Sequence, residues 1–194
     1  KTDHEAAAAL CRKLGHRNCK ALREAKEVDC HRKGLTAEEM KLLGTLGSVL
    51  PALETLLLPT GSVLAAAGPD GVQQLAEGLG AGALPAVTKL WLGGMQVGDA
   101  ELWLGGMQVG DAGASALAAA LEQGALPRLK SLILNSAAIG DAGLVALAPA
   151  LRRRPALEVL GLDGNPIGDE GLAALVAPPP AGAPPPPTGG LTKL

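Results

Sequence analysis

A unit of sequence occurs twice in succession between positions 126 and 175, and this repeat restricts the fold more than any other feature of the chain. The motif L-x-x-L-x-L spans residues 129–134 and returns at 157–162. The tripeptide I-G-D at residues 139–141 returns in the same way at 167–169. A fixed period in the range of about 20–50 residues is typical of a solenoid, in which each unit buries its apolar side against the units beside it.

Each unit contains two kinds of periodicity. The motif L-x-x-L-x-L alternates apolar and variable residues as a half-buried strand does. The second half carries apolar residues at helical spacing, namely Leu144, Leu147, Ala148 and Leu151. Each unit therefore predicts a strand, a turn and a helix. Because neither element buries its apolar side alone, successive coils are expected to stack strand beside strand and helix beside helix.

The order L-x-x-L-x-L followed by I-G-D-x-G-x-x-x-L-A-x-x-L resembles the ribonuclease-inhibitor type of leucine-rich repeat. The resemblance implies an α/β leucine-rich repeat solenoid in the shape of a horseshoe, with parallel strands on the concave face and helices on the convex face. It also implies that the usual work of the chain is to bind other proteins.

The same spacing divides the rest of the chain. Residues 1–33 predict a helical N-terminal capping segment, and residues 34–176 predict the repeat array. Within the capping segment, Cys19, Leu22 and Glu24 are a degenerate candidate for the strand motif.

The first coils of the array are longer than the unit at 126–175. Thr36 and Glu39 predict a capping box at the first helix. The strand motifs at positions 53–58 and 87–92 lie further apart than those at 129–134 and 157–162. The excess is expected in a loop over residues 59–68 and in a glycine-rich linker, where added length is tolerated.

One segment of the array is duplicated. Residues 90–100, LWLGGMQVGDA, recur without change as residues 102–112, and Glu101 alone separates the two copies. Parallel neighbours need a connection of about a dozen residues or more, so two adjacent copies leave no room for the helix that joins parallel strands. We therefore expect one copy to occupy the strand position and the other to be looped out, irregular or an error, with a functional duplication as the alternative.

The C-terminal residues depart from the repeat. Residues 177–190 predict a proline-rich insertion in an extended conformation. The alternative is that this segment is a ligand for an aromatic-lined groove. Residues 191–194 match the start of a further, truncated repeat, so more repeats are expected to follow. The chain begins at Lys1 rather than Met, which favours a processed product or a fragment.

Composition excludes several classes of function. The formal net charge is −2, and nucleic-acid binding would need a broader basic surface. No run of about 18 apolar residues predicts a membrane span. No nucleophile with ordered partners and no phosphate-binding motif is present, so we expect a protein without catalysis or a cofactor. The compartment is not identified by the sequence, although an intracellular location, cytoplasmic or organellar, is favoured.

All three cysteines lie in the capping segment. The favoured interpretation is that Cys11 and Cys19 pack as small apolar residues. A disulfide is one alternative. A tetrahedral zinc site is another, although no C-x-x-C pair supports it, and its ligands would be Cys11, His16, Cys19 and either Cys30 or His31.

Polar residues that recur in the array predict structural roles. The aspartates at residues 99, 111, 141 and 169 are expected to cap the helix that follows each of them. The turn asparagine of the family appears only as Asn165, so the turns near Met95, Met107 and Ala137 are expected to be looser. The arginines at 152–154 predict a solvated helix terminus.

The candidate site follows from the strand motif. The residue between the last two leucines of L-x-L points away from the core. That row is Leu57, Trp91, Trp103, Ile133 and Gly161, and it holds the only two aromatic residues of the chain. We predict a partner-binding surface formed by Leu57, Lys89, Trp91, Trp103, Ser131, Ile133, Asn135, Val159 and Asp163. Coverage of the tryptophans by a loop or a neighbouring subunit is the alternative.

The functional prediction is a non-catalytic scaffold that binds a partner protein through the concave sheet. Two alternatives stay open. The first is a structural accessory subunit inside a large assembly. The second is a GTPase-activating or receptor-type sensing module, as some members of this repeat family are.

Overall fold

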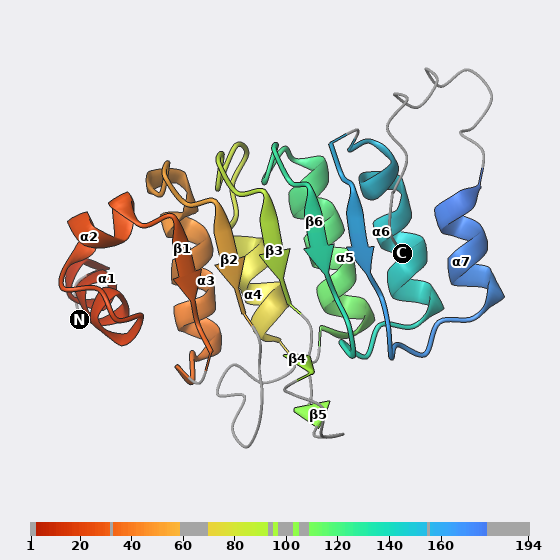
Figure 1. Ribbon diagram of the computed structural model, residues 1–194, viewed down its shortest axis with the longest axis horizontal. Helices are drawn as coiled ribbons and strands as arrows, with labels where there is room; N and C mark the ends of the chain where they lie inside the picture. Colours follow the sequence, from red (N-terminus) through yellow and green to blue (C-terminus); the bar gives the residue numbers. More distant parts are fainter. Residues whose placement is uncertain are drawn as a thin grey trace.

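The computed structural model describes residues 3–31, 33–58, 70–92, 95–96, 103–104, 109–154 and 156–177. Within these residues, five parallel strands form one sheet in the order β1-β2-β3-β6-β7. Their bounds are Glu27–Asp29, Thr55–Leu57, Lys89–Trp91, Ser131–Ile133 and Val159–Gly161. Figure 1 shows these strands in a row, with helices α3 to α7 in a second layer behind them. The predicted parallel sheet is therefore confirmed.

The described helices follow the predicted alternation with strands. Helix α1 spans Asp3–Lys13 and α2 spans Cys19–Glu24, and the helical layer consists of α3 (Ala37–Leu46), α4 (Gly71–Gly78), α5 (Gly110–Glu122), α6 (Asp141–Arg152) and α7 (Asp169–Val176). A short 3-10 helix, η1, covers Gly47–Val49. Each helix of the layer packs on the next. The predicted capping box is confirmed, because Thr36 and Glu39 exchange hydrogen bonds at the start of α3.

Leucines at one register position form the centre of the core. Leu56, Leu90, Leu132 and Leu160 are paired across neighbouring strands, and each is at most 1% exposed. In β2 and β6, by contrast, the residues on either side of the central leucine are partly exposed. This alternation is what a half-buried strand requires, since successive side chains leave opposite faces of the sheet.

The sheet begins inside the segment predicted as a cap. Strand β1 pairs with β2, so that Val28 lies beside Leu56. Ala25, Val28 and Cys30 have the spacing of L-x-x-L-x-L, with smaller residues in place of the leucines. The alternative motif at Cys19, Leu22 and Glu24 was wrong, because these residues form helix α2.

The two copies of the duplicated segment have different structures. The first copy supplies Leu90 and Trp91 to β3, which pairs directly with β2 and β6. The second supplies β5 (Trp103–Leu104), which pairs antiparallel with β4 (Met95–Gln96). Figure 1 shows β4 and β5 below the five-stranded sheet. The last residues of the second copy then begin helix α5.

Deletion of residues 93–104 is expected to stabilise the fold. The deletion would shorten the connection between Leu92 and Val109 from sixteen residues to four. Four residues also separate Leu134 from Ile139 in the regular coil. Because loop-closure entropy grows with the logarithm of length, this fourfold shortening should raise the free energy of unfolding by about 1 kcal/mol. Urea denaturation of both proteins measures the change, and a loss of stability would show that the hairpin supports the sheet.

Some expectations concern parts of the chain outside the described residues. These are the loop at 59–68, Asp99, Met107, the proline-rich residues from 178 onward and the truncated repeat at 191–194. In the parts of the chain that the structure does describe, no helix combines the length and apolar character needed to cross a membrane.

Candidate functional site

The strand face is the face of the sheet turned away from helices α3 to α7. Parallel register places Leu57, Trp91 and Ile133 side by side at its centre. Each of these side chains is half-buried. Backbone hydrogen bonds hold this row in place, since Leu58 N donates to Trp91 O and Leu92 N to Ile133 O, each at 2.8 Å. The result is three large apolar side chains on three adjacent strands, which we call the apolar row.

A more polar row lies beside the apolar row. The same register aligns Thr55, Lys89, Ser131 and Val159. Lys89 is exposed, and the other three are half-buried. Of the predicted partner-binding residues, the structure therefore brings together Leu57, Lys89, Trp91, Ser131, Ile133 and Val159.

Two acidic residues extend these rows and were missed by the sequence analysis. Asp29 pairs with Leu57, and Glu27 pairs with Thr55. Both side chains are exposed. The signal for this strand was the spacing of Ala25, Val28 and Cys30, which matches L-x-x-L-x-L. It was overlooked because each of these residues is smaller than leucine.

The apolar row ends at Gly161, which shares the register position of Ile133 but is buried by neighbouring side chains. A Cβ atom there would lie 2.7 Å from Asn135 Oδ1 and 3.1 Å from Ile133 Cδ1, so the neighbouring side chains fill the place of its missing side chain. Asn135 Oδ1 also accepts a hydrogen bond from Asp163 N at 3.1 Å. Asn135 thus joins two coils, while Asp163 remains exposed at the edge of the face.

The prediction that Trp103 shares the row with Trp91 was wrong. Trp103 belongs to β5, which pairs with β4 rather than with β3 or β6, and its partner there is Gln96. The physical reason is the closeness of the two copies along the chain, which leaves too few residues between them for a second coil.

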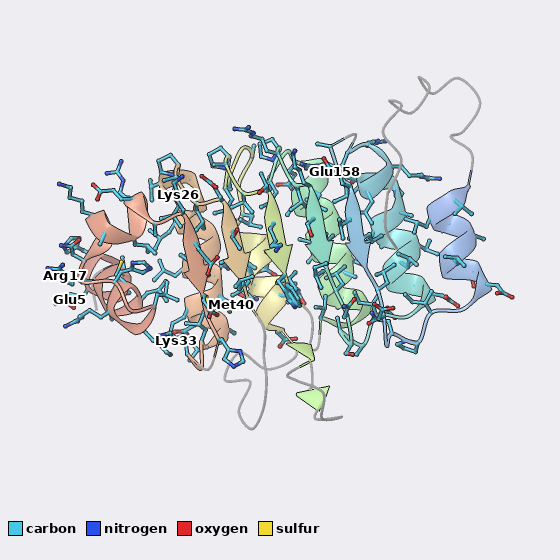
Figure 2. The ribbon with its side chains drawn as sticks, in the orientation of Figure 1. Glu5, Arg17, Lys26, Lys33, Met40 and Glu158 are labelled. Carbon is cyan, nitrogen blue, oxygen red and sulfur yellow. The ribbon has the colours of Figure 1, made fainter. Side chains whose placement is uncertain are left out.

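Charges at the beginning of the strands are paired across coils. Lys26 Nζ lies 3.1 Å from Glu54, and Lys130 Nζ lies 3.5 Å from Glu158. Figure 2 shows Lys26 and Glu158 at the end of the sheet where the strands begin. All four side chains are more than half exposed, so these pairs contribute little stability.

Aspartates in the helical layer cap a different helix from the one predicted. Asp111, in the first turn of α5, accepts hydrogen bonds from Gly140 N at 2.8 Å and Gly143 N at 2.9 Å, at the start of α6. Asp141 repeats this arrangement one coil later with Gly168 N and Gly171 N at the start of α7. Each carboxylate therefore caps the helix of the neighbouring coil, and the local prediction is corrected.

Asn165 satisfies backbone groups of two turns. Its Oδ1 accepts hydrogen bonds from Ala137 N at 3.0 Å and Ile139 N at 3.1 Å. Its Nδ2 donates to Leu134 O at 2.8 Å and Leu162 O at 2.7 Å. The turn at Ala137 has no asparagine of its own, but the next coil supplies one.

Arg154 is not a solvated helix terminus. It stands one repeat after Leu126, at the position equivalent to that leucine. Its guanidinium donates to Leu121 O in the last turn of α5, and to Ala125 O, at 2.7 Å, and Leu126 O beyond the end of that helix. Burial lowers the pKa of Arg154. The prediction holds for Arg153, whose side chain is three-quarters exposed.

The cysteines are arranged as a pair and a single residue. Cys11 and Cys30 are buried and Cys19 is half-buried, and the Cys11 thiol donates to Cys19 Sγ at 2.9 Å. Burial is the main cause that raises the pKa of Cys30 to about 12. Among the described residues, no three His, Cys, Asp or Glu side chains form a group able to hold a metal ion, so the alternative zinc site at Cys11, His16, Cys19 and Cys30 gains no support.

Comparison with known families identifies the repeat. Residues 126–148 and 155–176 match the family model of the leucine-rich repeat. These matches cover the two units from which the period was found, and together less than a quarter of the chain. A comparison with curated proteins gives no match.

Proposed function

We propose, from the two leucine-rich repeats that the chain carries, that it is a non-catalytic scaffold whose strand face binds a partner protein. Leucine-rich repeat domains generally mediate protein–protein interaction, and a stacked array offers an extended binding surface. In this proposal the array has the horseshoe form of the ribonuclease-inhibitor type, and the strand face is its concave side.

The apolar row carries this proposal. Leu57, Trp91 and Ile133 are large side chains, each half-buried and adjacent by register. Binding hot spots are enriched in tryptophan, because it covers a large area while few rotatable bonds must be fixed. The flanking Lys89, Asp29 and Glu27 are exposed charges that suit the polar rim of an interface.

Trp91→Ala and Ile133→Ala are each expected to weaken partner binding about thirtyfold, since loss of a hot-spot side chain costs about 2 kcal/mol. The measurement compares proteins retained from a cell extract by the immobilised wild-type chain and by each variant, with thermal melts recorded in parallel. Val145→Ala is the matched control, because Val145 is an exposed apolar residue on α6, in the helical layer.

The proposal predicts that Val145→Ala retains the same proteins as the wild-type chain, and that binding falls in the other two variants while the melts change little. Binding and melting temperature falling in proportion would instead assign the apolar row to the fold.

Helix α7 favours a second candidate, a structural subunit of a larger assembly. Leu172 and Val176 are 47% and 70% exposed. The carboxylate of Asp169 is exposed and accepts no hydrogen bond from any described residue, whereas Asp111 and Asp141 each cap a neighbouring helix. Size-exclusion chromatography of Leu172→Ser and the wild-type chain tests this candidate. A monodisperse wild-type monomer would argue against it, and an aggregate that Leu172→Ser disperses would support it.

A further inference from the structure

The N-terminal helices bring two thiols into contact. Cys11 lies in the last turns of α1, and Cys19 is the first residue of α2. Their sulfur atoms are 2.9 Å apart, although seven residues separate them in the sequence. A disulfide needs the two sulfurs about 2 Å apart, so only a small shift separates this contact from a covalent bond.

We propose that Cys11 and Cys19 are a redox modification site, at which exchange with a low-molecular-weight disulfide such as oxidised glutathione forms a reversible disulfide between α1 and α2. This inference concerns the N-terminal helices and does not depend on the proposed function of the strand face.

Differences in exposure set the order of the chemical steps. Cys11 is fully buried and Cys30 is 7% exposed, whereas Cys19 is only half-buried, so a small oxidant is expected to reach Cys19 first. The Cys19 thiolate attacks one sulfur of oxidised glutathione, forms a mixed disulfide and releases one glutathione thiolate. The Cys11 thiolate then attacks Cys19 Sγ and displaces the second glutathione. Two protein thiols are oxidised to one disulfide, and one oxidised glutathione is reduced to two glutathiones.

The surroundings of Cys11 agree with this order. Burial is the largest cause that raises the pKa of Cys11 to about 12, followed by the hydrogen bond to Cys19 and the charge of Cys19. The thiolate is the nucleophile in such exchange, so Cys11 reacts poorly while Cys19 is a free thiol. A mixed disulfide on Cys19 removes the neighbouring acidic group and so eases ionisation of Cys11.

The disulfide would close a short loop in a part of the chain that already contacts the array. Asn18 caps α2 through its side chain, which accepts from Ala21 N at 2.9 Å. Lys13 joins α1 to the start of α3 through Gly34 O at 2.8 Å and the carboxylate of Glu39. A cross-link here reduces the freedom of the unfolded N-terminal segment and is therefore expected to protect it from proteolysis.

Incubation of the purified chain with oxidised glutathione, followed by tryptic digestion and mass spectrometry, tests the proposal. Trypsin cleaves after Arg12 and Arg17, so a disulfide between Cys11 and Cys19 links two otherwise separate peptides. The expected product has lost two hydrogen atoms, contains this linked pair and keeps a single thiol that reacts with maleimide after unfolding. Dithiothreitol should restore all three thiols.

Single variants separate this site from unspecific oxidation. Cys11→Ala is expected to hold glutathione stably on Cys19, because the resolving thiol is missing. Cys19→Ala is expected to resist the oxidant while folded, and Cys30→Ala should form the same linked pair as the wild-type chain. A linked pair that includes Cys30, a mixed disulfide that persists on the wild-type chain, or no reaction at all would each overturn the proposal. Circular dichroism confirms that every variant is folded.

Discussion

Gly78→Ala is expected to lower the free energy of unfolding by about 3 kcal/mol, because its methyl group has no space between helices α3 and α4. A Cβ atom at Gly78 would overlap Lys41 O and approach Thr45 N to 2.9 Å and Gly44 Cα to 3.1 Å. All three are backbone atoms, so no side chain can rotate out of the way. The expected loss runs against intrinsic helix propensity, which favours alanine over glycine by about 1 kcal/mol.

Gly80→Ala is the matched control for this prediction. Gly80 lies two residues further along, and a Cβ atom there would meet nothing within 4 Å. Urea denaturation followed by circular dichroism should therefore show a large loss for Gly78→Ala and little change for Gly80→Ala. If both variants unfold like the wild-type chain, α3 and α4 are not packed backbone against backbone.

Arg154→Ala is expected to cost about 2–3 kcal/mol of stability, because three carbonyl groups lose a charged donor and hydrogen bonds from charged donors are stronger than neutral ones. The guanidinium donates to Leu121 O, Ala125 O and Leu126 O. Ala125 and Leu126 are buried, so their carbonyl groups would lose a partner away from solvent. Thermal or urea unfolding measures this loss.

Arg153→Ala is the comparison for Arg154→Ala. Arg153 carries the same charge on the preceding residue, but it is largely exposed and lies 3.8 Å from Glu122. Exposed ion pairs contribute about 0–1 kcal/mol, so this variant should unfold like the wild-type chain. Equal losses for the two variants would mean that the helix terminus responds to charge alone, as the sequence first suggested.

The repeat period predicted the parallel sheet of stacked coils, and local sequence patterns predicted features that lie within one coil. The spacing of Leu129, Leu132 and Leu134 predicted an inward-facing strand, and Thr36 with Glu39 predicted a helix start. Both are confirmed, since these leucines are buried and the capping box is formed. Such features depend on side-chain alternation and on contacts within a few residues, which a sequence pattern records directly.

Predictions about polar groups failed where their partners lie in a neighbouring coil. Asp111, Asp141 and Arg154 were each assigned to a helix terminus close to them in the sequence, but each binds backbone groups 27 to 33 residues away. A local motif cannot distinguish the two possibilities, because the residue types that cap a helix are the same in both cases. The separation between each of these side chains and its partners is close to one repeat period, because the partners lie in the neighbouring coil.

The candidate site was predictable except where the repeat is imperfect. Leu57, Trp91 and Ile133 follow the leucine spacing, and the structure aligns them. Trp103 was wrongly included because its sequence surroundings are identical to those of Trp91, while chain length alone decides which copy pairs in the sheet. Asp29 was overlooked because alanine, valine and cysteine replace the leucines of its strand.

The most direct measurement of the proposed function is site-specific photo-crosslinking. A photoreactive amino acid replaces Ile133 in one protein and Val145 in another, and each is irradiated in the same cell extract. Binding through the strand face predicts a discrete partner adduct from position 133 and none from position 145. An adduct formed from position 145, with none from position 133, would place the partner on the helical layer and contradict the account.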